Sequence, residues 1–262
     1  MHKNFSFTRD IQIANDFNAA SNELENKIIL ITGAGDGIGK QLALTYSQLG
    51  ATCILLGKTV SKLENVYDEI EQAGGNEPAI VPLDLRGATP QNYIDMGSTI
   101  REQFGHLDGV VHNAGMLGML SPFAQIKVDE YTDIMQVNVN AAMYMTQGLL
   151  PALEASSNGA SVIFTTSTVG RIGRKYWGTY SISKFATEGM MEVLADEYKP
   201  EKIRFNCVNP GATRTSMRAS AYPAEDVNQL LTPADIMPTY CYLASDASKS
   251  ITGKVFDCQP KV

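Results

Sequence analysis

The chain alternates between short apolar runs and longer segments in which apolar residues recur every three or four positions. An apolar run of about four to eight residues predicts a buried strand, and the three-to-four repeat predicts a helix with one buried face. In the segment 37–49, for example, Ile38, Leu42 and Tyr46 fall on one helical face. The predicted strands cover residues 27–32, 52–56, 79–83, 107–112, 161–165, 202–208 and 254–257. The predicted helices cover residues 37–49, 61–72, 90–104, about 129–153, 180–198 and 232–243.

This order of elements predicts the fold class. Strands that are apolar on both faces and separated by helices indicate a parallel sheet covered on both sides. Right-handed crossovers then wind the chain into a doubly wound α/β fold. About seven strands fit 262 residues as a single domain, and no linker or repeat interrupts the pattern. Ligands of such sheets bind at the carboxyl ends of the strands, so the residues that follow each strand are the candidates for a site.

The first 26 residues precede this alternating pattern. They are polar and contain no convincing strand, so residues 1–26 are predicted to form an arm on a domain that spans residues 27–262. The opening stretch MHKNFSFTRDIQ has no apolar run and no small-residue cleavage site, which predicts that it is not a secretory signal.

Composition and charge narrow the class of protein. Hydrophobic residues make up 44% and charged residues 19% of the chain, as is typical of a globular protein with a full core. The net charge of −7 gives no electrostatic reason to bind nucleic acid or an anionic membrane, and no apolar run predicts a membrane span. The four cysteines form no CxxC or Cys/His cluster, so no metal site is predicted, and a cytoplasmic location is expected.

A glycine-rich turn follows the first predicted strand, with the sequence TGAGDGIG over residues 32–39. Gly33 permits a tight turn, Gly37 lets the backbone approach a pyrophosphate, and Gly39 lets the helix pack close to the strand. The helix that begins here directs free N–H groups at an anion. Because the turn lies between a strand and a helix, it indicates a dinucleotide site of the Rossmann type rather than an unliganded loop.

The end of the second strand indicates which dinucleotide binds. An acidic residue there would hydrogen-bond the ribose 2′-hydroxyl of NAD. Here Gly57 occupies that position and Lys58 follows, a pair that suits the 2′-phosphate of NADP, and Lys62 can assist one helical turn later. Asp36 opposes this interpretation, because it puts a negative charge in the phosphate-binding turn. NADP is therefore predicted over NAD, and the alternative is that Lys58 is only a solvated surface lysine.

Polar and small residues also follow the next two strands. Asp84 and Leu85 come after the third strand, where a carboxylate can accept a hydrogen bond from the adenine amino group. Asn113, Ala114 and Gly115 come after the fourth, where small residues leave room for the adenosine ribose and Asn113 can tie neighbouring strands together. Either group alone is also typical of a turn. Together they outline a dinucleotide that lies across the sheet.

Ser167, Tyr180 and Lys184 form the candidate catalytic group. Ser167 follows the fifth strand, and Tyr180 and Lys184 lie four residues apart on the next helix, so they share a face. A free tyrosine titrates at about 10, and a nearby ammonium favours the phenolate. Lys184 is therefore expected to lower the pKa of Tyr180 and make it an acid or base that works near neutrality. Ser167 can hydrogen-bond the substrate oxygen.

The same Tyr-x-x-x-Lys spacing recurs at Tyr198 and Lys202. Pro200 lies between these two residues and ends the helix, so their side chains need not share a face. The spacing alone is therefore weak evidence. The preceding serine and the dinucleotide site are what favour Tyr180.

Together these motifs resemble those of the short-chain dehydrogenase/reductase family in its single-domain form, over roughly residue 24 to the end. The similar segments are TGAGDGIG, HNAG, the VNV segment around Asn138, Ser167 followed by YSISK at 180–184, and NPGATRT at 209–215. Within the family, the stretches LDGVVHNAG, MQVNVNA, KFATEGMMEVLADEY and TPADIMP look most like the bacterial YciK-type oxidoreductases, whose substrates are poorly defined.

The resemblance implies an oxidoreductase that moves a hydride between NADP(H) and a small-molecule carbonyl or alcohol, in a homodimer or homotetramer. Asn138, Ser167, Tyr180 and Lys184 would form its catalytic tetrad, with Tyr180 as the general acid or base. Lys184 would also bind the nicotinamide ribose, Asn138 would link the proton relay to solvent, and Thr215 would meet the nicotinamide carboxamide. The predicted cofactor contacts are Gly33, Asp36, Gly37, Ile38, Gly39, Lys58, Asp84, Leu85, Asn113, Ala114, Gly115, Tyr180, Lys184, Pro210, Gly211, Thr213 and Thr215.

Substrate contacts are expected from three loops, residues 116–123, 170–177 and 216–226. These loops are rich in apolar and aromatic residues, which favours a modest hydrophobic carbonyl compound. Arginines in the same region can instead receive a carboxylate or phosphate. His112, at a buried strand end, is expected to be structural rather than catalytic. The apolar and aromatic residues are Met116, Leu117, Met119, Leu120, Tyr176, Trp177, Met217 and Tyr222, and the arginines are Arg171, Arg174, Arg214 and Arg218.

Two other classes of function compete with an oxidoreductase. A cofactor-binding sensor or scaffold without turnover does not need Tyr180 and Lys184 together. An epimerase or dehydratase of the related extended fold needs a longer C-terminal substrate domain than this chain has. The sequence therefore favours an NADP-dependent oxidoreductase.

Overall fold

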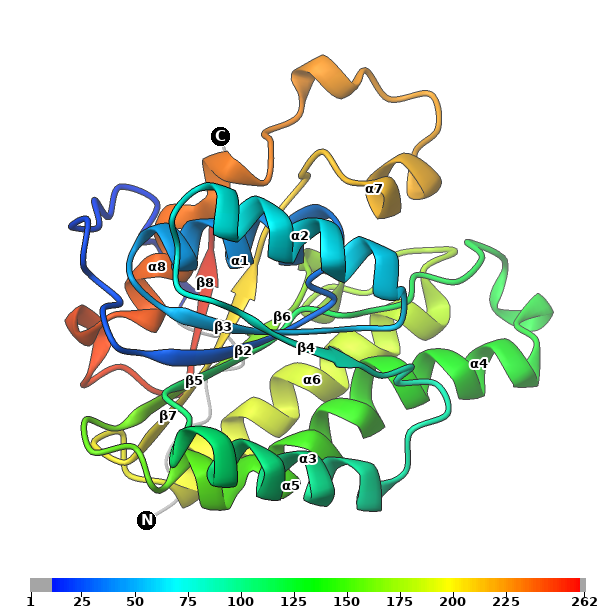
Figure 1. The fold of residues 1–262 in the computed structure, drawn as a ribbon. Helices are drawn as coiled ribbons and strands as arrows, with labels where there is room; N and C mark the ends of the chain where they lie inside the picture. Colours follow the sequence, from blue (N-terminus) through cyan, green and yellow to red (C-terminus); the bar gives the residue numbers. More distant parts are fainter. Residues whose placement is uncertain (1–10, 260–262) are drawn as a thin grey trace, which may run out of the picture.

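The computed structural model describes residues 11–259 and contains eight strands and eight α-helices (Figure 1). The strands are β1 (Ile11–Gln12), β2 (Ile28–Thr32), β3 (Thr52–Gly57), β4 (Ala79–Pro82), β5 (Gly109–His112), β6 (Ala160–Thr165), β7 (Ile203–Asn209) and β8 (Lys254–Asp257). The helices are α1 (Gly37–Gln48), α2 (Val60–Gln72), α3 (Pro90–Phe104), α4 (Val128–Met135), α5 (Ala141–Leu153), α6 (Gly178–Glu197), α7 (Ser216–Ala221) and α8 (Met237–Ala244).

All eight strands pair in parallel in one sheet, in the order β1-β8-β7-β6-β5-β2-β3-β4. From β2 the chain adds β3 and β4 on one side, and then returns to add β5 to β8 on the other side. The direction of winding therefore reverses between β2 and β5. In a doubly wound sheet, the crevice outside the carboxyl ends of the strands at this switch point is where ligands bind.

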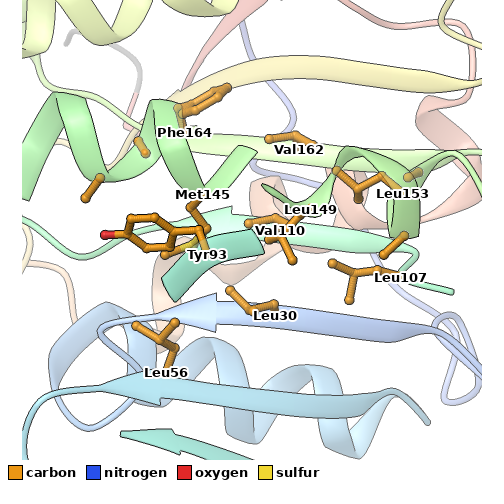
Figure 2. Close-up of a cluster of buried hydrophobic side chains, with 14 of the residues drawn as sticks. Leu30, Leu56, Tyr93, Leu107, Val110, Met145, Leu149, Leu153, Val162 and Phe164 are labelled. Atoms are coloured by element: carbon orange, nitrogen blue, oxygen red, sulfur yellow. The ribbon is translucent and has the colours of Figure 1, made fainter. Parts of the chain in front are cut away.

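Helices cover both faces of the sheet, as expected for a doubly wound α/β fold (Figure 1). Along β2, Leu30 belongs to the core cluster shared with α3 and α5, and Ile29 and Ile31 belong to the cluster shared with α1 and α8. Figure 2 shows the first cluster, in which Leu149 of α5 and Tyr93 of α3 meet the sheet. Both faces of the central strands are thus buried, which explains why those strands are continuous apolar runs.

The fold class is confirmed, but the predicted number of about seven strands is wrong. The eighth strand is β1, from the N-terminal arm, whose residue Ile11 pairs with Val255 of β8. Further along the arm, Ala14 and Leu24 are buried in the core cluster beneath α1 and α8. The first ten residues of the arm lie outside the described part of the chain. None of the helices within residues 11–259 is both long enough and apolar enough to cross a membrane.

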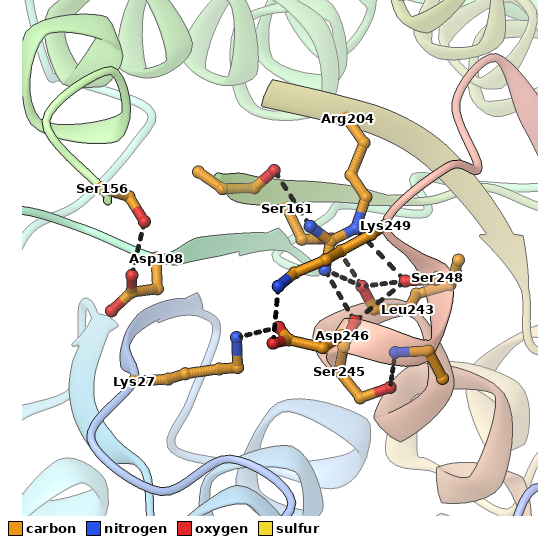
Figure 3. A network of polar contacts seen from close by, with 12 residues as sticks. Lys27, Asp108, Ser156, Ser161, Arg204, Leu243, Ser245, Asp246, Ser248 and Lys249 are labelled. Atoms are coloured by element: carbon orange, nitrogen blue, oxygen red, sulfur yellow. Dashed lines mark hydrogen bonds and ion pairs between the residues drawn. The ribbon is translucent and has the colours of Figure 1, made fainter. Parts of the chain in front are cut away.

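A buried arginine lies near the start of β7, and Figure 3 shows its polar contacts. Arg204, near the start of β7, is 1% exposed and donates hydrogen bonds to the carbonyl oxygens of Leu243 and Ser245 and to the hydroxyl of Ser248. These bonds join β7 to the turn after α8. Because buried carbonyls need partners, one guanidinium here satisfies a turn that would otherwise be costly to bury.

Candidate active site

A cleft opens at the carboxyl ends of the strands, at the switch point between β2 and β5. It consists of two adjoining cavities of about 430 and 280 Å³ that share Gly33, Asp36, Ala114 and Gly115 in their walls. The larger cavity reaches the ends of β3 and β4, and the smaller one reaches the ends of β6 and β7 and the start of α6. The predicted site residues in the cleft walls are Gly33, Asp36, Gly37, Ile38, Lys58, Asp84, Leu85, Asn113, Ala114, Gly115, Ser167, Tyr180, Lys184, Pro210, Gly211, Thr213 and Thr215.

Gly39 does not line the cleft but shapes it from below. A Cβ atom at this position would lie 2.1 Å from the carbonyl oxygen of Gly33 and 2.7 Å from the Asn113 side chain. The first turn of α1 therefore packs directly on the turn that follows β2. Gly33 has a φ of +68° and Gly37 a φ of +52°, both in the left-handed region that favours glycine. The predicted tight turn at Gly33 and close packing at Gly39 are present, and the approach of a pyrophosphate at Gly37 stays a prediction.

Asn113 joins the two strands at the switch point. Its backbone N–H donates to the hydroxyl of Thr32 at 2.9 Å, and its Nδ2 donates to the carbonyl of Thr32 at 3.2 Å. The Thr32 hydroxyl also accepts a hydrogen bond from the N–H of Ala114. The predicted tie between neighbouring strands is present, and Thr32 is the partner that sequence reasoning did not name.

Asp36 caps α1 in the middle of the phosphate-binding turn. Its Oδ1 accepts a hydrogen bond from the N–H of Gly37 at 2.7 Å, and its Oδ2 pairs with Lys62 of α2 at 2.6 Å. The hydrogen bond from Lys62 is the main cause that holds the pKa of this carboxyl below its usual value. Lys62 thus neutralises the negative charge that opposed the NADP prediction. Lys58 lies exposed at the end of β3, on the wall of the larger cavity.

Asn138 lies in a π-helical turn, Gln136–Asn140, between α4 and α5. The helical stretch predicted over about 129–153 is present, and the π-turn within it was not predicted. Turns of this kind are often found at functional sites. The buried Asn138 side chain accepts a hydrogen bond from the N–H of Met116 at 2.7 Å, and donates to the carbonyl of Met116 and to the hydroxyl of Ser183. It also lines a small pocket behind the cleft together with Lys184. Asn138 thus fixes both the loop after β5 and the helix α6.

Tyr180 and Lys184 lie one turn apart on α6, at the same end of the cleft as Ser167. The Lys184 Nζ atom lies 5.5 Å from the centre of the Tyr180 ring and donates to the carbonyl of Thr165 at 2.7 Å. Burial lowers the pKa of Lys184 to about 8. The geometry brings a phenol, an ammonium and a hydroxyl together, a combination that can hold a substrate oxygen and move a proton to or from it.

The expected direction of the Tyr180 pKa is wrong for this structure. Burial raises the pKa of Tyr180 to about 12, and a hydrogen bond with Ser167 opposes this shift only in part. Loss of solvation of the phenolate is thus the largest cause, and the Lys184 ammonium donates its hydrogen bond to the backbone carbonyl of Thr165. Tyr180 is therefore a protonated phenol at neutral pH, ready to donate.

The second Tyr-x-x-x-Lys pair is separate from the cleft. Tyr198 follows the last residue of α6 and packs against Phe205, with 5.5 Å between ring centres. Within the described chain, neither Tyr198 nor Lys202 lines the cleft.

Each predicted substrate loop contributes to the wall of the smaller cavity, through Leu117, Trp177 and Met217 respectively. The Trp177 ring lies between those of Tyr180 and Tyr222, with centres 5.8 and 5.9 Å apart. Arg218 of α7 stacks on the Tyr222 ring at 4.0 Å and pairs with Glu225. The helix α7 was not predicted, because six residues are too few to show a helical period.

Two of the four candidate anion-binding arginines are engaged inside the protein. Arg218 makes two hydrogen bonds to the Glu225 carboxylate, and Arg171 makes two to the Asp257 carboxylate. Sequence reasoning missed Glu225, Asp257 and the buried Glu188 as members of this region. No local pattern could reveal them, because a lone acidic residue on a helix or strand usually faces solvent.

His112 lies behind the cleft and is buried, as expected of a structural residue. Its ring stacks on Phe164 with 4.8 Å between centres, and its Nε2 lies 3.0 Å from the hydroxyl of Thr146. Burial lowers the pKa of His112 to about 3, so the imidazole stays neutral in the fold.

This depressed pKa predicts a loss of stability in acid. The unfolded chain binds a proton at His112 below pH 6.5, whereas the folded chain does not until about pH 3, so stability is lost as the pH falls through that window. At pH 5 the loss from this residue is about 2 kcal/mol. Urea unfolding at pH 8 and pH 5 should therefore show a smaller acid loss for His112→Asn than for the wild type. Equal losses would contradict the buried, neutral imidazole.

The fold and the cleft define the class of protein, and comparison with known proteins agrees. The short chain dehydrogenase family model matches residues 27–226, so the chain belongs to this family of oxidoreductases. It is 52% identical to the uncharacterized oxidoreductase YciK of Escherichia coli K12 over 237 residues, which cover 90% of this chain and 93% of that protein. The predicted family and its YciK-type resemblance are confirmed.

Two solved structures extend this similarity. A short-chain dehydrogenase from Shigella flexneri 2a in complex with NADP superposes with a TM-score of 0.90, at 50% identity, over 92% of this chain and all of that chain. A short-chain dehydrogenase from Escherichia coli CFT073 in complex with NADPH superposes with a TM-score of 0.89, at the same identity and coverage.

Proposed function

We propose that this chain is an NADP(H)-dependent oxidoreductase that interconverts a carbonyl compound and an alcohol, with Tyr180 as the general acid or base. The observation that carries the proposal is a cleft, made of the two adjoining cavities, that has different polar side chains at its two ends. Lys58 and Asp84 lie at one end, and Ser167, Tyr180 and Lys184 lie at the other. A dinucleotide that spans the switch point would bring its nicotinamide to Tyr180.

The residues of the cleft fit NADP(H). Close packing at Gly39 leaves the N-terminus of α1 open to a pyrophosphate, and Lys62 already neutralises Asp36 beside it. The exposed Lys58 can meet a 2′-phosphate with a charge-assisted hydrogen bond. The similar structures that hold NADP and NADPH support the same cofactor here.

Residues of the chain itself would supply the proton and hold the substrate oxygen in place. NADP(H) would supply or accept the hydride. In reduction, the Tyr180 phenol donates its proton to the substrate oxygen, and in oxidation it takes one back. Ser167 donates a hydrogen bond to the same oxygen and steadies its developing charge. Lys184 stabilises the phenolate that remains, and Asn138 holds α6 against the loop after β5. Burial raises the pKa of Tyr180 to about 12, so the phenol carries the proton that this role requires in reduction.

The substrate end of the cleft favours an uncharged, apolar carbonyl compound. Trp177, Leu117 and Met217 contribute to its wall. Arg218 also lines it, but its charge is already balanced by Glu225. A substrate carboxylate would have to compete with that internal pair, whereas a ring or alkyl group can pack on the aromatic side chains.

The proposal is tested by binding and turnover measured separately. Titration with NADPH should change its fluorescence, and a panel of cyclic, aromatic and alkyl ketones and aldehydes should then be screened for loss of NADPH absorbance. Turnover of uncharged members over their carboxylated analogues is expected. Binding of NADPH without turnover on the whole panel would instead support the sensor or scaffold alternative.

Lys58→Asp should shift the cofactor preference from NADPH toward NADH. A hydrogen bond to a charged group contributes about 1.5–3 kcal/mol, so the affinity for NADPH should fall roughly 10- to 100-fold. The affinity for NADH should change much less, because it has no 2′-phosphate. The dissociation constants of both cofactors, measured by fluorescence, check this. An unchanged ratio would mean that Lys58 is a surface lysine only.

The homodimer or homotetramer and the cytoplasmic location remain predictions from the sequence.

A further inference from the structure

Four charged side chains lie buried together behind the substrate end of the cleft. Lys184 and Glu188 are one turn apart on α6, and Glu188 is 0% exposed. Arg171, in the loop after β6, and Asp257, at the end of β8, have side chains only 12% and 10% exposed. Two acids and two bases are present, so their formal charges balance. The cofactor and substrate roles proposed above use only Lys184.

The acids and bases are connected by short contacts. The Thr166 hydroxyl donates to Glu188 Oε1 at 2.7 Å, and Arg171 Nε lies 3.8 Å from the same oxygen. Arg171 then donates to both carboxylate oxygens of Asp257, at 2.6 and 3.4 Å. We call Thr166, Arg171, Glu188 and Asp257 the Glu188 network. It joins α6 to the residue before Ser167 and to the last strand.

The network continues to the loop after β7. Asn209 donates from Nδ2 to Asp257 at 2.9 Å and to the hydroxyl of Thr168 at 3.2 Å. The N–H of Gly211 in turn donates to Asn209 Oδ1 at 3.2 Å. The same buried charges therefore contact the Ser167 loop on one side. On the other side they contact the loop after β7, which leads to Thr215, the predicted contact of the nicotinamide carboxamide.

The Ser167 loop rests closely on α6 at this point. A Cβ atom at Gly170 would lie 2.9 Å from the Thr166 hydroxyl and 3.0 Å from the Cβ of Lys184. The Ser181 hydroxyl donates to the carbonyl of Val169 at 2.6 Å. Because this region has so little free space, a change in the charge or length of Glu188 should shift both Lys184 and the Ser167 loop.

Stability alone is a poor reason for such a cluster. The loss of hydration on burial costs several kcal/mol per ion, and replacing a buried ion pair by apolar residues is often neutral or stabilising. A cluster of this kind beside a candidate catalytic lysine points instead to a role in the reaction.

We propose that Glu188 is a positioning residue of the active site: its buried carboxylate places a negative charge one helical turn from Lys184 and, through Thr166 and Arg171, holds the Ser167 loop against α6. This role rests on the proposed function, since only turnover requires the charged form of Lys184 beside Tyr180. Glu188 itself does not touch the substrate; it acts through Lys184.

The charged groups around Lys184 determine the direction in which its pKa should change when the Glu188 charge is removed. The titratable groups around Lys184 are Tyr180 and Glu188 on α6, Cys207 on β7 and His112 on β5. Arg171 and Asp257 face Glu188 from behind. Burial lowers the pKa of Lys184 to about 8, and Cys207 and the Glu188 carboxylate oppose the shift. Removing the Glu188 charge should therefore lower the pKa of Lys184 further, so the ammonium is lost at a lower pH.

The test is the pH profile of ketone reduction by Glu188→Gln. Glutamine keeps the shape and can still accept the Thr166 hydrogen bond, so only the charge is removed. The alkaline limb of the pH profile of kcat should move to lower pH by about one unit, which for a pKa of about 8 lowers kcat at pH 8 by about fivefold. The dissociation constant of NADPH at pH 6 should stay close to the wild-type value.

A second glutamate on the same helix provides the matched control. Glu192 lies one turn after Glu188 and is exposed, so Glu192→Gln removes the same charge from the solvent side and should leave the alkaline limb in place. If the alkaline limb of the Glu188→Gln profile coincides with that of the wild type, the positioning role is wrong, even if kcat or the melting temperature falls. A purely structural role would lower activity equally at every pH.

A second variant keeps the test possible if Glu188→Gln does not fold. Asp257→Asn removes the other acid of the cluster and should move the limb in the same direction by a smaller amount. A wild-type protein that reduces no carbonyl compound overturns the proposed function and this role together. Wild-type turnover that is lost in Tyr180→Phe, with an unshifted limb in both acid variants, overturns the positioning role alone.

Discussion

Tyr180→Phe should abolish reduction of carbonyl compounds while NADPH still binds. The substitution removes a single hydroxyl from a half-buried ring whose other contact, with Trp177, is kept. General acid catalysis by a positioned side chain contributes about 10²- to 10⁴-fold, so kcat should fall by that factor. The dissociation constant of NADPH, measured by fluorescence, should change by less than about fivefold, since one hydrogen bond contributes only about 1 kcal/mol or less.

Tyr198→Phe is the control that the chain itself provides. It removes the same hydroxyl from the other Tyr-x-x-x-Lys pair, beside Phe205 and away from the residues that line the cleft. Its kcat should stay within about twofold of the wild type. If Tyr180→Phe were fully active, or if Tyr198→Phe were the inactive variant, the proposed mechanism would be wrong.

Gly39→Ala should cost both stability and cofactor binding. The new methyl group would lie 2.1 Å from the carbonyl oxygen of Gly33, which is backbone and cannot rotate away. Either α1 or the turn after β2 must shift, and overpacking of this kind costs about 1–3 kcal/mol. Because the same turn is proposed to hold the pyrophosphate, the affinity for NADPH should fall at least about 100-fold. Urea unfolding and fluorescence titration measure the two effects.

Gly189→Ala is the matched substitution for this prediction. Gly189 also lies inside a helix, α6, but a Cβ atom there would have no heavy atom within 4 Å. Alanine should stabilise this helix by up to about 1 kcal/mol and leave NADPH binding unchanged. Normal NADPH affinity in Gly39→Ala would mean that the close packing of α1 on the turn is not needed for the site.

Local chemistry decided how well the sequence predicted each element. The helix α3 spans the predicted residues because Pro90 begins it and Gly105, with a φ of +80°, follows its last residue. The strand β1 was missed because its two residues gain a partner only from Val255 and Phe256, at the other end of the chain. The π-turn at Asn138 was missed because it covers only five residues, too few to show a change of period.

In the candidate site, too, local features could be predicted from the sequence and features that depend on distant segments could not. Ser167, Tyr180 and Asn113 were found because each follows a strand or shares a helical face, and both properties can be read locally. The pKa of Tyr180 could not be predicted, since it depends on how far distant segments bury the phenol. Glu188 was missed for the same reason, because its surroundings come from β6, β8 and the loop between β6 and α6.

The two-residue strand β1 has a consequence for the solution behaviour of the protein. In the described sheet it is one of the two edge strands, and it occupies the hydrogen-bonding groups of β8 beside Val255 and Phe256. An open strand edge is a template onto which another polypeptide can add, and short terminal strands are one means of blocking it. Removal of the residues up to Gln12 would expose the edge of β8. The truncated protein should therefore aggregate at concentrations where the full chain does not.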